Sequence, residues 1–161
     1  MIIYTSYYNS PIGLLEMIGS KHAIHALRFV QTKTIAEKDS PPIIADCLKQ
    51  LEEYFSGNRK TFSINVEQGG TDYQKFVWKK LEDIPYGKTI SYLDLARNLG
   101  DEKSARAVGN ANGKNKIPVI IPCHRVIGTN DSLVGYAGGI WRKQWLLDHE
   151  KKFTYGIQTL F

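Results

Sequence analysis

Cysteine is scarce in this chain of 161 residues, and other missing features exclude several classes of protein. Two cysteines, Cys47 and Cys123, are too few for the disulfide framework of a small secreted domain. No apolar run approaches the roughly 18 residues of a membrane span, and the first residues lack the basic start of a signal peptide. We therefore expect a cytoplasmic protein with reduced cysteines and no membrane contact.

A set of metal ligands is also missing. His22 and His25 are three residues apart in an expected strand, so their side chains face opposite sides and make a poor chelate. Cys47 falls in an expected helix, where it is most simply a small buried hydrophobe. We expect no bound metal and no cofactor.

Positive charge is modest but unevenly distributed. The formal net charge is +5, and residues 1–70 hold seven Lys/Arg against seven Asp/Glu. Residues 71–161 hold fourteen Lys/Arg against nine Asp/Glu, so the whole excess lies there. A polyanion would meet this C-terminal half, although an ordinary solvated basic surface gives the same count.

The polar, glycine-bearing stretch 67–72 separates two halves of different pattern. We therefore expect two domains, residues 1–70 and 71–161. The elements expected in the first are a β-meander with strands at 2–8, 14–18 and 23–30, a helix capped by Ser40 that ends at Gly57, and a strand at 62–66.

The second half has a helical pattern. The three expected helices run from Thr71 to Leu81, from Ser91 to Gly100 and from Lys103 to about Gly113. The last two are short and joined by a tight glycine-containing turn, which favours a helix-turn-helix. Together the two halves predict a mixed α/β (α+β) protein.

The most informative run is 121–126, Ile-Pro-Cys-His-Arg-Val, which sets a thiol beside an imidazole and a guanidinium. The apolar, proline-containing run before it predicts that Cys123 ends a short buried strand. Burial raises the pKa of a thiol, so a nucleophilic Cys123 needs the neighbouring His124 or Arg125. Successive side chains of an extended chain face opposite ways, so we expect a bridging water, or a turn, between Cys123 and His124.

The third helix of the C-terminal half carries mostly small side chains, with Ala105, Ala107 and Gly109 around Arg106. A helix that reads bases in the major groove needs several long donors and acceptors, and this one has few. Small side chains would let it press into a minor groove about 6 Å wide. Close packing inside the protein is the other interpretation of the same pattern.

The string Pro-Cys-His-Arg-Val resembles the active-site motif of the O6-alkylguanine-DNA alkyltransferases, and four further segments match in order. These are 87–92 (Gly-Lys-Thr-Ile-Ser-Tyr), 105–109 (Ala-Arg-Ala-Val-Gly), Asn115, and 135–139 (Gly-Tyr-Ala-Gly-Gly) leading into 145–150 (Trp-Leu-Leu-Asp-His-Glu). The resemblance covers residues 71–150. It implies a ribonuclease H-like N-terminal domain and a C-terminal domain with a helix-turn-helix.

The resemblance also implies an activity. The family repairs DNA by moving the alkyl group of O6-alkylguanine, and for some members of O4-alkylthymine, irreversibly onto a cysteine. The base is first flipped out of the duplex by a protein docked in the minor groove. We therefore expect a monomer whose partner is double-stranded DNA containing O6-alkylguanine.

Roles for individual residues follow from the resemblance. Cys123 would be the nucleophile, with His124 oriented by Glu150 so that a water takes the thiol proton, and Tyr92 would donate to N3 of the leaving guanine. Arg106 would fill the gap left by the extruded nucleotide. The other expected DNA contacts are Ala105, Ala107, Gly109, Ser91 and Lys103.

The expected pocket residues are Tyr136, Ala137, Gly138, Val126 and Asn115. Tyr136 would stack on the base and the amide of Ala137 would donate to O6, although some relatives have serine in place of Ala137. Asn115 would brace the turn around the active-site segment. Arg125 is left with two alternatives, a tie to the protein interior or a contact with the DNA backbone.

Three other functions compete with alkyl transfer. A non-catalytic lesion sensor is related to the same family, but those relatives carry tryptophan where this chain has Cys123. A cysteine hydrolase using Cys123 and His124 would turn over and would need an oxyanion hole. A helix-turn-helix transcription factor is disfavoured because the third helix has few long side chains that could read bases.

The tail 151–161 is expected simply to pack against the rest of the protein.

Overall fold

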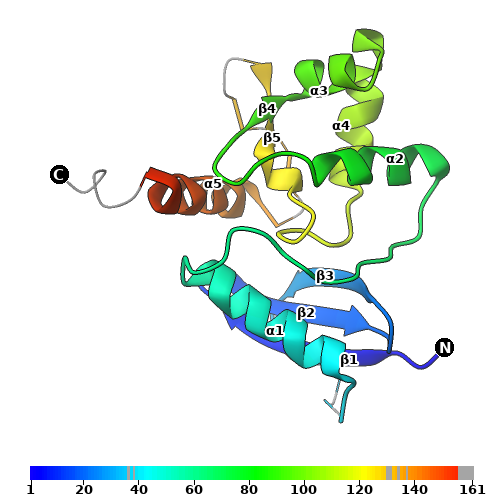
Figure 1. The fold of residues 1–161 in the computed structure, drawn as a ribbon, viewed down its shortest axis with the longest axis vertical. Helices are drawn as coiled ribbons and strands as arrows, with labels where there is room; N and C mark the ends of the chain where they lie inside the picture. Colours follow the sequence, from blue (N-terminus) through cyan, green and yellow to red (C-terminus); the bar gives the residue numbers. More distant parts are fainter. Residues whose placement is uncertain (36, 38, 130–131, 134, 137, 156–161) are drawn as a thin grey trace. The chain divides into compact units, whose positions relative to one another are not determined.

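The computed structural model describes residues 1–35, 37, 39–129, 132–133, 135–136 and 138–155, and it divides into two compact units (Figure 1). The first unit is Met1–Gly69 and the second is Gly70–Phe161. Each unit is described by itself.

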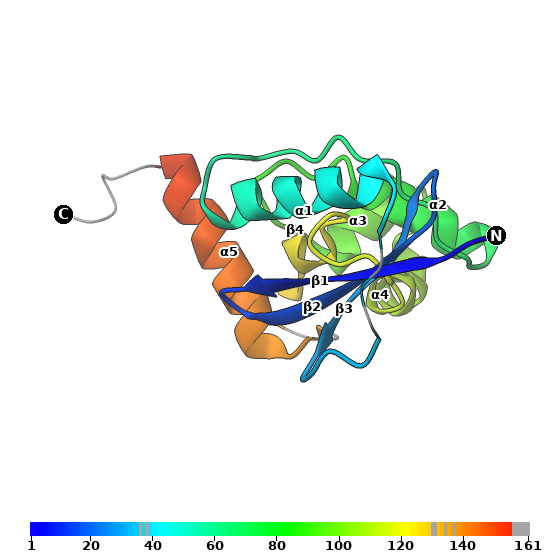
Figure 2. The ribbon, with the colours of Figure 1, turned by 90° about the horizontal axis from the view of Figure 1, so that it is seen from below.

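The N-terminal unit is a three-stranded antiparallel sheet covered on one face by a helix (Figure 2). The strands β1 (Tyr4–Ser10), β2 (Gly13–Gly19) and β3 (Ile24–Val30) follow one another in a meander, as predicted. Helix α1 (Pro42–Phe55) buries Ile44, Leu51 and Tyr54, and the sheet contributes Leu15, Met17 and Leu27 to the core. Burial of such side chains contributes about 1.5–3 kcal/mol each.

Two details of the N-terminal unit differ from the prediction. The N-cap of α1 is Pro41 rather than Ser40, and no side chain caps the helix. Residues 62–66 do not form a strand; they make only an isolated parallel bridge between Ile24 and Val66.

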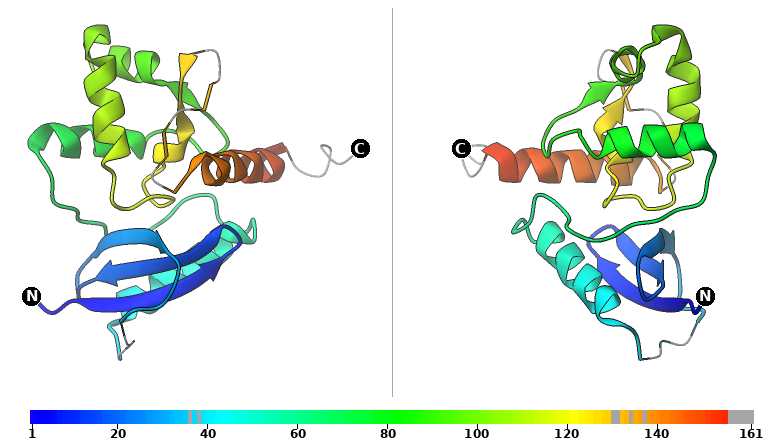
Figure 3. Two further views of the ribbon diagram at one scale, coloured as in Figure 1. Left: turned by 180° about the vertical axis from the view of Figure 1, so that it is seen from behind. Right: turned by 45° about the vertical axis from the view of Figure 1, so that its right-hand side comes forward.

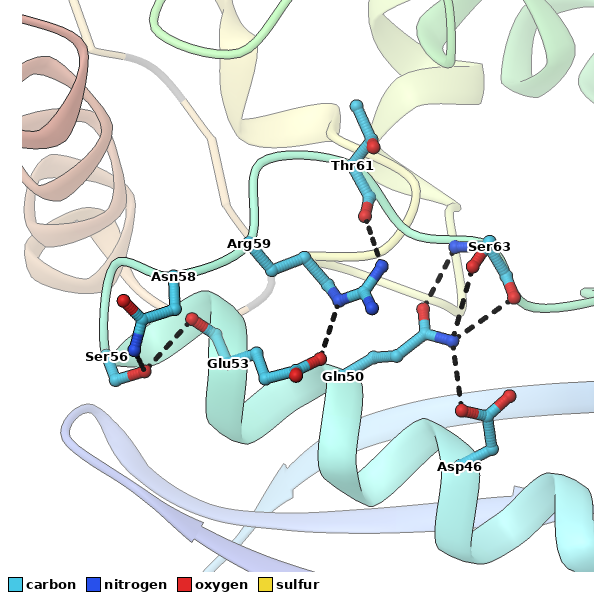
Figure 4. Close-up of polar contacts among 8 residues, drawn as sticks. All are labelled: Asp46, Gln50, Glu53, Ser56, Asn58, Arg59, Thr61 and Ser63. Carbon is cyan, nitrogen blue, oxygen red and sulfur yellow. Dashed lines mark hydrogen bonds and ion pairs between the residues drawn. The ribbon is translucent and has the colours of Figure 1, made fainter.

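Side chains of α1 and the loop after it explain why the segment 58–63 needs no ladder of strand hydrogen bonds (Figure 4). Gln50 donates through Nε2 to the Ser63 carbonyl at 3.2 Å and accepts from the Ser63 amide at 2.9 Å. Arg59 donates to the Thr61 carbonyl at 2.9 Å and to Glu53 at 3.0 Å. The backbone groups of Ser63 and the Thr61 carbonyl are therefore satisfied by side chains rather than by a neighbouring strand.

The C-terminal unit begins with helix α2 (Asp72–Leu81), whose start is fixed by a capping box between Thr71 and Gln74. Helices α3 (Tyr92–Asn98) and α4 (Ala105–Gly113) lie side by side (Figure 3), with the 3₁₀ turn η1 (Glu102–Ser104) between them. They form the predicted helix-turn-helix. Trp78 of α2 donates to the Ala111 carbonyl of α4 at 2.8 Å, which joins α2 to the pair.

A two-stranded parallel pairing brings distant parts of this unit together. Strand β4 (Ile90–Ser91) pairs with β5 (Val126–Ile127), with Ile90 opposite Val126. Tyr92 therefore follows one strand while the 3₁₀ turn η2 (Cys123–Arg125) precedes the other. Helix α5 (Ile140–Tyr155) completes the described part of the unit.

The predicted buried strand before Cys123 is wrong, although the segment is buried. Val119 adopts a left-handed conformation with φ 73°, and the Ile121 amide donates back to the Ile117 carbonyl at 3.0 Å. The chain therefore folds into a turn rather than extending, and Cys123 opens a 3₁₀ turn. A left-handed β-branched residue is strained, so this turn persists only because its surroundings fix it.

Candidate active site

The turn that presents Cys123 is held by Asn115. The side chain of Asn115 accepts from the Ile117 amide at 3.1 Å and donates to the Ile121 carbonyl at 2.9 Å. The Cys123 amide donates to that same carbonyl at 2.8 Å. Asn115 thus braces the segment that carries the thiol, in the position that the resemblance implied.

Next to the thiol lies a buried set of three ionisable side chains, His124, Arg125 and Glu150. His124 Nε2 is 2.7 Å from Glu150 Oε2, and Arg125 reaches both carboxylate oxygens, with Nε at 2.8 Å and Nη2 at 3.0 Å. The second Arg125 nitrogen, Nη1, donates to the Ile84 carbonyl at 2.7 Å. Arg125 therefore ties the motif to the protein interior, which decides between its two alternatives.

Gly87 adds a fourth hydrogen bond to the same carboxylate. Its amide donates to Glu150 Oε1 at 3.1 Å from a backbone with φ 78°. A side chain at this position would collide with Thr154 of α5. The glycine of the segment 87–92 is therefore required by the close approach to α5 as well as by its φ.

Opposing effects set the charges in this cluster. Burial pushes the pKa of the Glu150 carboxyl upward, but His124 and Arg125 outweigh it and hold that pKa well below its usual range. Burial lowers the pKa of His124 below 6.5, against the attraction of Glu150. At neutral pH, Glu150 is therefore charged and His124 is neutral.

A neutral His124 has one nitrogen that donates and one that accepts. Because a carboxylate can only accept, Nε2 carries the proton and donates to Glu150. Nδ1 is then the basic nitrogen, and it is buried without a hydrogen-bond partner among the described residues. This atom is available to take a proton.

Cys123 is 7% exposed, and burial raises the pKa of its thiol. A hydrogen bond with Asn115 and the positive charge of Lys143 oppose that rise. Since the net shift is upward, the resting side chain is a thiol that needs a base before it can act as a nucleophile. Within the described residues, no hydrogen bond joins the thiol to His124.

Lys143 is the cation of the site that the sequence reasoning missed. It is fully buried, and its ammonium donates to the Val126 carbonyl at 2.7 Å and to the Gly135 carbonyl at 3.4 Å. Burial lowers its pKa to about 8, against the effect of the thiolate form of Cys123. Lys143 precedes Glu150 by seven residues, which is about two helical turns. This spacing predicts that the two side chains lie on one face of α5.

Tyr92 is brought to the motif by the pairing of β4 with β5. Burial raises the pKa of its phenol, while a hydrogen bond with the Asn112 side chain opposes the rise. The Lys143 ammonium lies 5.8 Å from the centre of the ring. Asn112 was also missed by the sequence reasoning. The sequence could have indicated it only as a polar residue on the face of α4 that is expected to point inward.

The expected pocket residues lie around the same cluster, as far as the structure describes them. Val126 is buried, and Tyr136 accepts from the Gly139 amide through its carbonyl at 2.8 Å. Burial and the neighbouring Cys123 hold the pKa of the Tyr136 phenol well above its usual value. Gly138 accepts from Arg142 at 2.6 Å. Ala137 lies outside the described residues.

The residues expected at the DNA lie on the outer side of the helix-turn-helix. Arg106, Ala107 and Lys103 are exposed, while Ala105 and Gly109 are partly exposed. The inner face of α4 buries Val108, Ala111 and Asn112. Ser91 accepts from the Asp94 amide at 3.0 Å and so caps α3. The small residues of α4 thus occur on its solvent face and not only at internal contacts.

The described residues offer neither a cluster of metal ligands nor a membrane-spanning helix. They contain no group of three or more His, Cys, Asp or Glu side chains that could hold a metal ion. They also contain no helix long and apolar enough to cross a bilayer.

The C-terminal unit combines a helix-turn-helix, a motif common in DNA-binding proteins, with a buried cysteine next to a histidine that bonds a carboxylate. Residues 3–68 match the family described as the ribonuclease-like domain of 6-O-methylguanine DNA methyltransferase, and residues 72–152 match its DNA-binding domain. The chain belongs to the family of methylated-DNA–protein-cysteine methyltransferases.

Named relatives are similar over almost the whole chain. The constitutive methylated-DNA–protein-cysteine methyltransferase of Bacillus subtilis is 48% identical over 157 residues, which cover 92% of this chain and 95% of the relative. The protein of that name from Methanosarcina acetivorans is 39% identical over 153 residues, 92% of this chain and 98% of its own.

Solved structures show the same fold. The O6-methylguanine methyltransferase of Mycobacterium tuberculosis superimposes with a TM-score of 0.85 at 40% identity, covering 99% of both chains. A structure of the M. tuberculosis protein in complex with DNA has a TM-score of 0.83 at 43% identity, covering 91% of this chain and 92% of the other. The predicted fold class is confirmed by these likenesses.

Proposed function

We propose that this protein repairs alkylated DNA by direct reversal, moving the alkyl group of O6-alkylguanine in duplex DNA onto Cys123 in a single turnover. The observation that carries the proposal is the buried thiol beside a neutral His124, whose Nε2 is held by Glu150 at 2.7 Å and whose Nδ1 is unpartnered in the described part of the chain. The names of the relatives and the DNA complex of the M. tuberculosis protein support it.

Activation of the nucleophile starts from a protonated thiol. A water between Cys123 and His124 passes the thiol proton to Nδ1, because the two side chains share no direct hydrogen bond in the described residues. Glu150 stabilises the imidazolium that forms, and Arg125 keeps Glu150 ionised. The ammonium of Lys143 stabilises the thiolate.

The transfer itself is a displacement at the alkyl carbon. The Cys123 thiolate forms a carbon–sulfur bond while the bond from that carbon to O6 breaks, and guanine leaves. A proton donor from Tyr92 at N3 neutralises the charge that develops on the leaving base. The segment 135–139 encloses the base, with Tyr136 stacked on it and the amide of Ala137 donating to O6.

Base flipping is part of the proposal, because O6 of a stacked guanine faces the major groove and lies out of reach of a buried thiol. The bare outer face of α4 enters the minor groove, and Arg106 occupies the gap in the stack. Ala105, Ala107 and Gly109 allow the close approach, while Ser91 and Lys103 contact the backbone. Flipping costs a few kcal/mol, less for a damaged and weakly paired base.

The proposal extends to organisation and location. Residues 71–161 are the DNA-binding and alkyltransferase domain, and residues 1–70 form a separate α/β domain. The protein acts as a monomer. A cytoplasmic location fits the mechanism, because only a reduced Cys123 can accept an alkyl group.

The competing functions are weaker on specific grounds. An oxyanion hole commonly uses the amide of the nucleophile, but the Cys123 amide already donates to the Ile121 carbonyl at 2.8 Å. A lesion sensor needs no thiol, no neutral histidine and no buried carboxylate beside them. The charges of the cluster would therefore have no role in a sensor.

Replacing Cys123 by serine tests the proposal. A hydroxyl is far less acidic than a thiol, so we expect Cys123→Ser to abolish transfer from O6-methylguanine DNA. Binding to the same DNA should stay within a few-fold, because the docking surface lies on α4. Transfer above a few per cent of the wild-type level, measured with radiolabelled DNA, would show that another group is the nucleophile.

A further inference from the structure

Arg142 lies in the first turn of α5, directly after the segment 135–139 that the proposed mechanism closes over the base. Its Nη1 donates to the Gly138 carbonyl at 2.6 Å, and its backbone amide donates to the Gly139 carbonyl at 3.1 Å. A hydrogen bond from a charged donor is about twice as strong as a neutral one. The mechanism above gives this side chain no role.

The neighbouring carbonyls of the segment are held from the same direction. The Tyr136 carbonyl accepts from the Gly139 amide at 2.8 Å, and the Gly135 carbonyl accepts from the Lys143 ammonium at 3.4 Å. Arg142 is only half-buried, whereas Lys143 is fully buried. The bond to Gly138 can therefore be removed without opening the core of the unit.

Glycine makes these bonds necessary. The segment 135–139 contains three glycines, and Gly139 adopts a φ of 96°. Glycine loses more conformational freedom on ordering than any other residue and has no side chain that could pack. A fixed shape of the segment must therefore come from bonds to its backbone, and a binding surface that is already ordered costs the ligand less affinity.

Trp141 lies against the same part of the segment. It is 56% exposed, and the centre of its ring is 4.5 Å from the Arg142 guanidinium. A Cβ added at Gly139 would lie 3.5 Å from Cδ1 of the ring, which is an ordinary contact distance. Burial does not explain a tryptophan this exposed, whereas attraction of a cation to its ring places it beside Arg142 and fixes the guanidinium.

We propose that Arg142, with Trp141 against its guanidinium, is a positioning residue for alkyl transfer: it holds the glycine-rich segment 135–139 in the conformation that receives the base. The inference rests on the proposed function. It assigns the first turn of α5 to the binding of the base, while Glu150, further along the same helix, holds His124 beside the thiol.

The test uses Arg142→Met, which removes the guanidinium but keeps an unbranched side chain. Lys152→Met is the matched control, because Lys152 is also a cation of α5 that lies over the ring of its neighbour, 5.4 Å from the centre of Phe153. Both variants are reacted with free O6-benzylguanine, which the segment must receive, and with iodoacetamide, which alkylates a thiol without it.

We expect Arg142→Met to lower the second-order rate constant for benzyl transfer about tenfold, because a charge-assisted bond that orders the segment is lost. Alkylation of Cys123 by iodoacetamide, measured on its peptide, should not be slowed. Lys152→Met should change neither rate. A loss with iodoacetamide equal to the loss with O6-benzylguanine would overturn the inference.

Hydrogen–deuterium exchange measures the order of the segment without any reaction. In Arg142→Met, the amides of the peptide 135–142 should exchange about fivefold faster or more, and in Lys152→Met they should exchange as in the wild type. Unchanged exchange in Arg142→Met would overturn the inference. If Arg142→Met does not fold, Arg142→Gln takes its place with the same expected direction.

A double-mutant cycle tests the pairing with Trp141. Trp141→Leu alone should slow benzyl transfer about threefold, and it should cause no further loss when it is added to Arg142→Met. Losses that multiply would show that Trp141 does not act through Arg142.

These measurements also separate the inference from the function on which it rests. Absence of benzyl transfer by the wild-type protein would remove the proposed function. Normal benzyl transfer by both the wild type and Arg142→Met would remove only the role of Arg142.

Discussion

Among single residues, Glu150 joins the candidate site together through its hydrogen bonds. Its two oxygens accept from His124, from Arg125 twice, and from the Gly87 amide. A carboxylate has about four such acceptor sites, so its capacity is filled. Glutamine could not replace it, because an amide nitrogen would face donors.

Removing the cation from this cluster should be costly. Arg125→Met leaves Glu150 buried and charged without the guanidinium that bonds both of its oxygens, and we expect about 3–5 kcal/mol of lost stability in urea unfolding. Arg97→Met is the control, because Arg97 also makes two hydrogen bonds to carboxylate oxygens, one from Asp94 and one from Glu102, but is exposed. The control should be nearly neutral. Equal losses in both variants would show that burial does not govern the energy of the cluster.

The shifted histidine predicts how activity depends on pH. Because burial lowers the pKa of His124 below 6.5, the base stays neutral at pH 6.5, and the rate of transfer to free O6-benzylguanine should fall only at more acidic pH. Stability changes with pH in the same direction. His124 of the unfolded chain takes up a proton near pH 6.5, whereas His124 of the folded protein does so only at lower pH, so stability falls as pH drops. A rate that is already halved at pH 6.5 would contradict this assignment.

At the scale of elements, the two faces of α4 carry different residues. The outer face is small apart from Arg106, and the inner face carries Asn112 and receives the Trp78 hydrogen bond at the Ala111 carbonyl. The sequence left open whether the small residues serve packing or docking. A Cβ at Gly109 would lie 3.4 Å from the Tyr92 ring, so this position serves packing, whereas Ala107 is exposed and its contact with DNA stays a proposal.

Arg106 allows docking to be measured separately from chemistry. We expect Arg106→Ala to slow repair of duplex DNA about tenfold or more and to leave the reaction with free O6-benzylguanine almost unchanged, since the free base needs no extrusion. Arg59→Ala removes the same charge from the N-terminal unit and serves as the control. Equal losses on both substrates would assign Arg106 to the folded structure rather than to DNA.

Elements with strong local signals were predictable from the sequence, and those decided by long-range contacts were not. The meander and the Thr71 start of α2 follow from local patterns. The strand expected before Cys123 was wrong because Val119 turns the chain, and the one expected at 62–66 was wrong because the Ser63 backbone bonds with the Gln50 side chain and the segment makes one isolated bridge, from Val66 to Ile24. Neither effect is visible in a local window of sequence.

At the scale of the whole C-terminal unit, the site is assembled from four separate segments of the chain, residues 87–92, 112–115, 123–126 and 143–150. The motif and its resemblance indicated Cys123, His124 and Glu150 as a group, and the structure joins His124 to Glu150 directly. Lys143 and Asn112 could not be assigned in this way, because their roles depend on the carbonyls of Val126 and Cys123 that they reach. The position of a backbone carbonyl in the folded protein cannot be read from the type of residue that carries it.

Single use of the protein follows from the chemistry of the product. A thioether on Cys123 has no leaving group that water can displace, unlike the thioester of a cysteine hydrolase. Nothing in the described site can regenerate the thiol. Each molecule should therefore act once.

Single use can be measured by mass spectrometry of limiting protein titrated with excess O6-methylguanine DNA. We predict a plateau at about one methyl group per active molecule, found as an increase of about 14 Da on the peptide that contains Cys123. Repaired DNA that continues to accumulate beyond one equivalent, or a methyl group on any other peptide, would contradict the account.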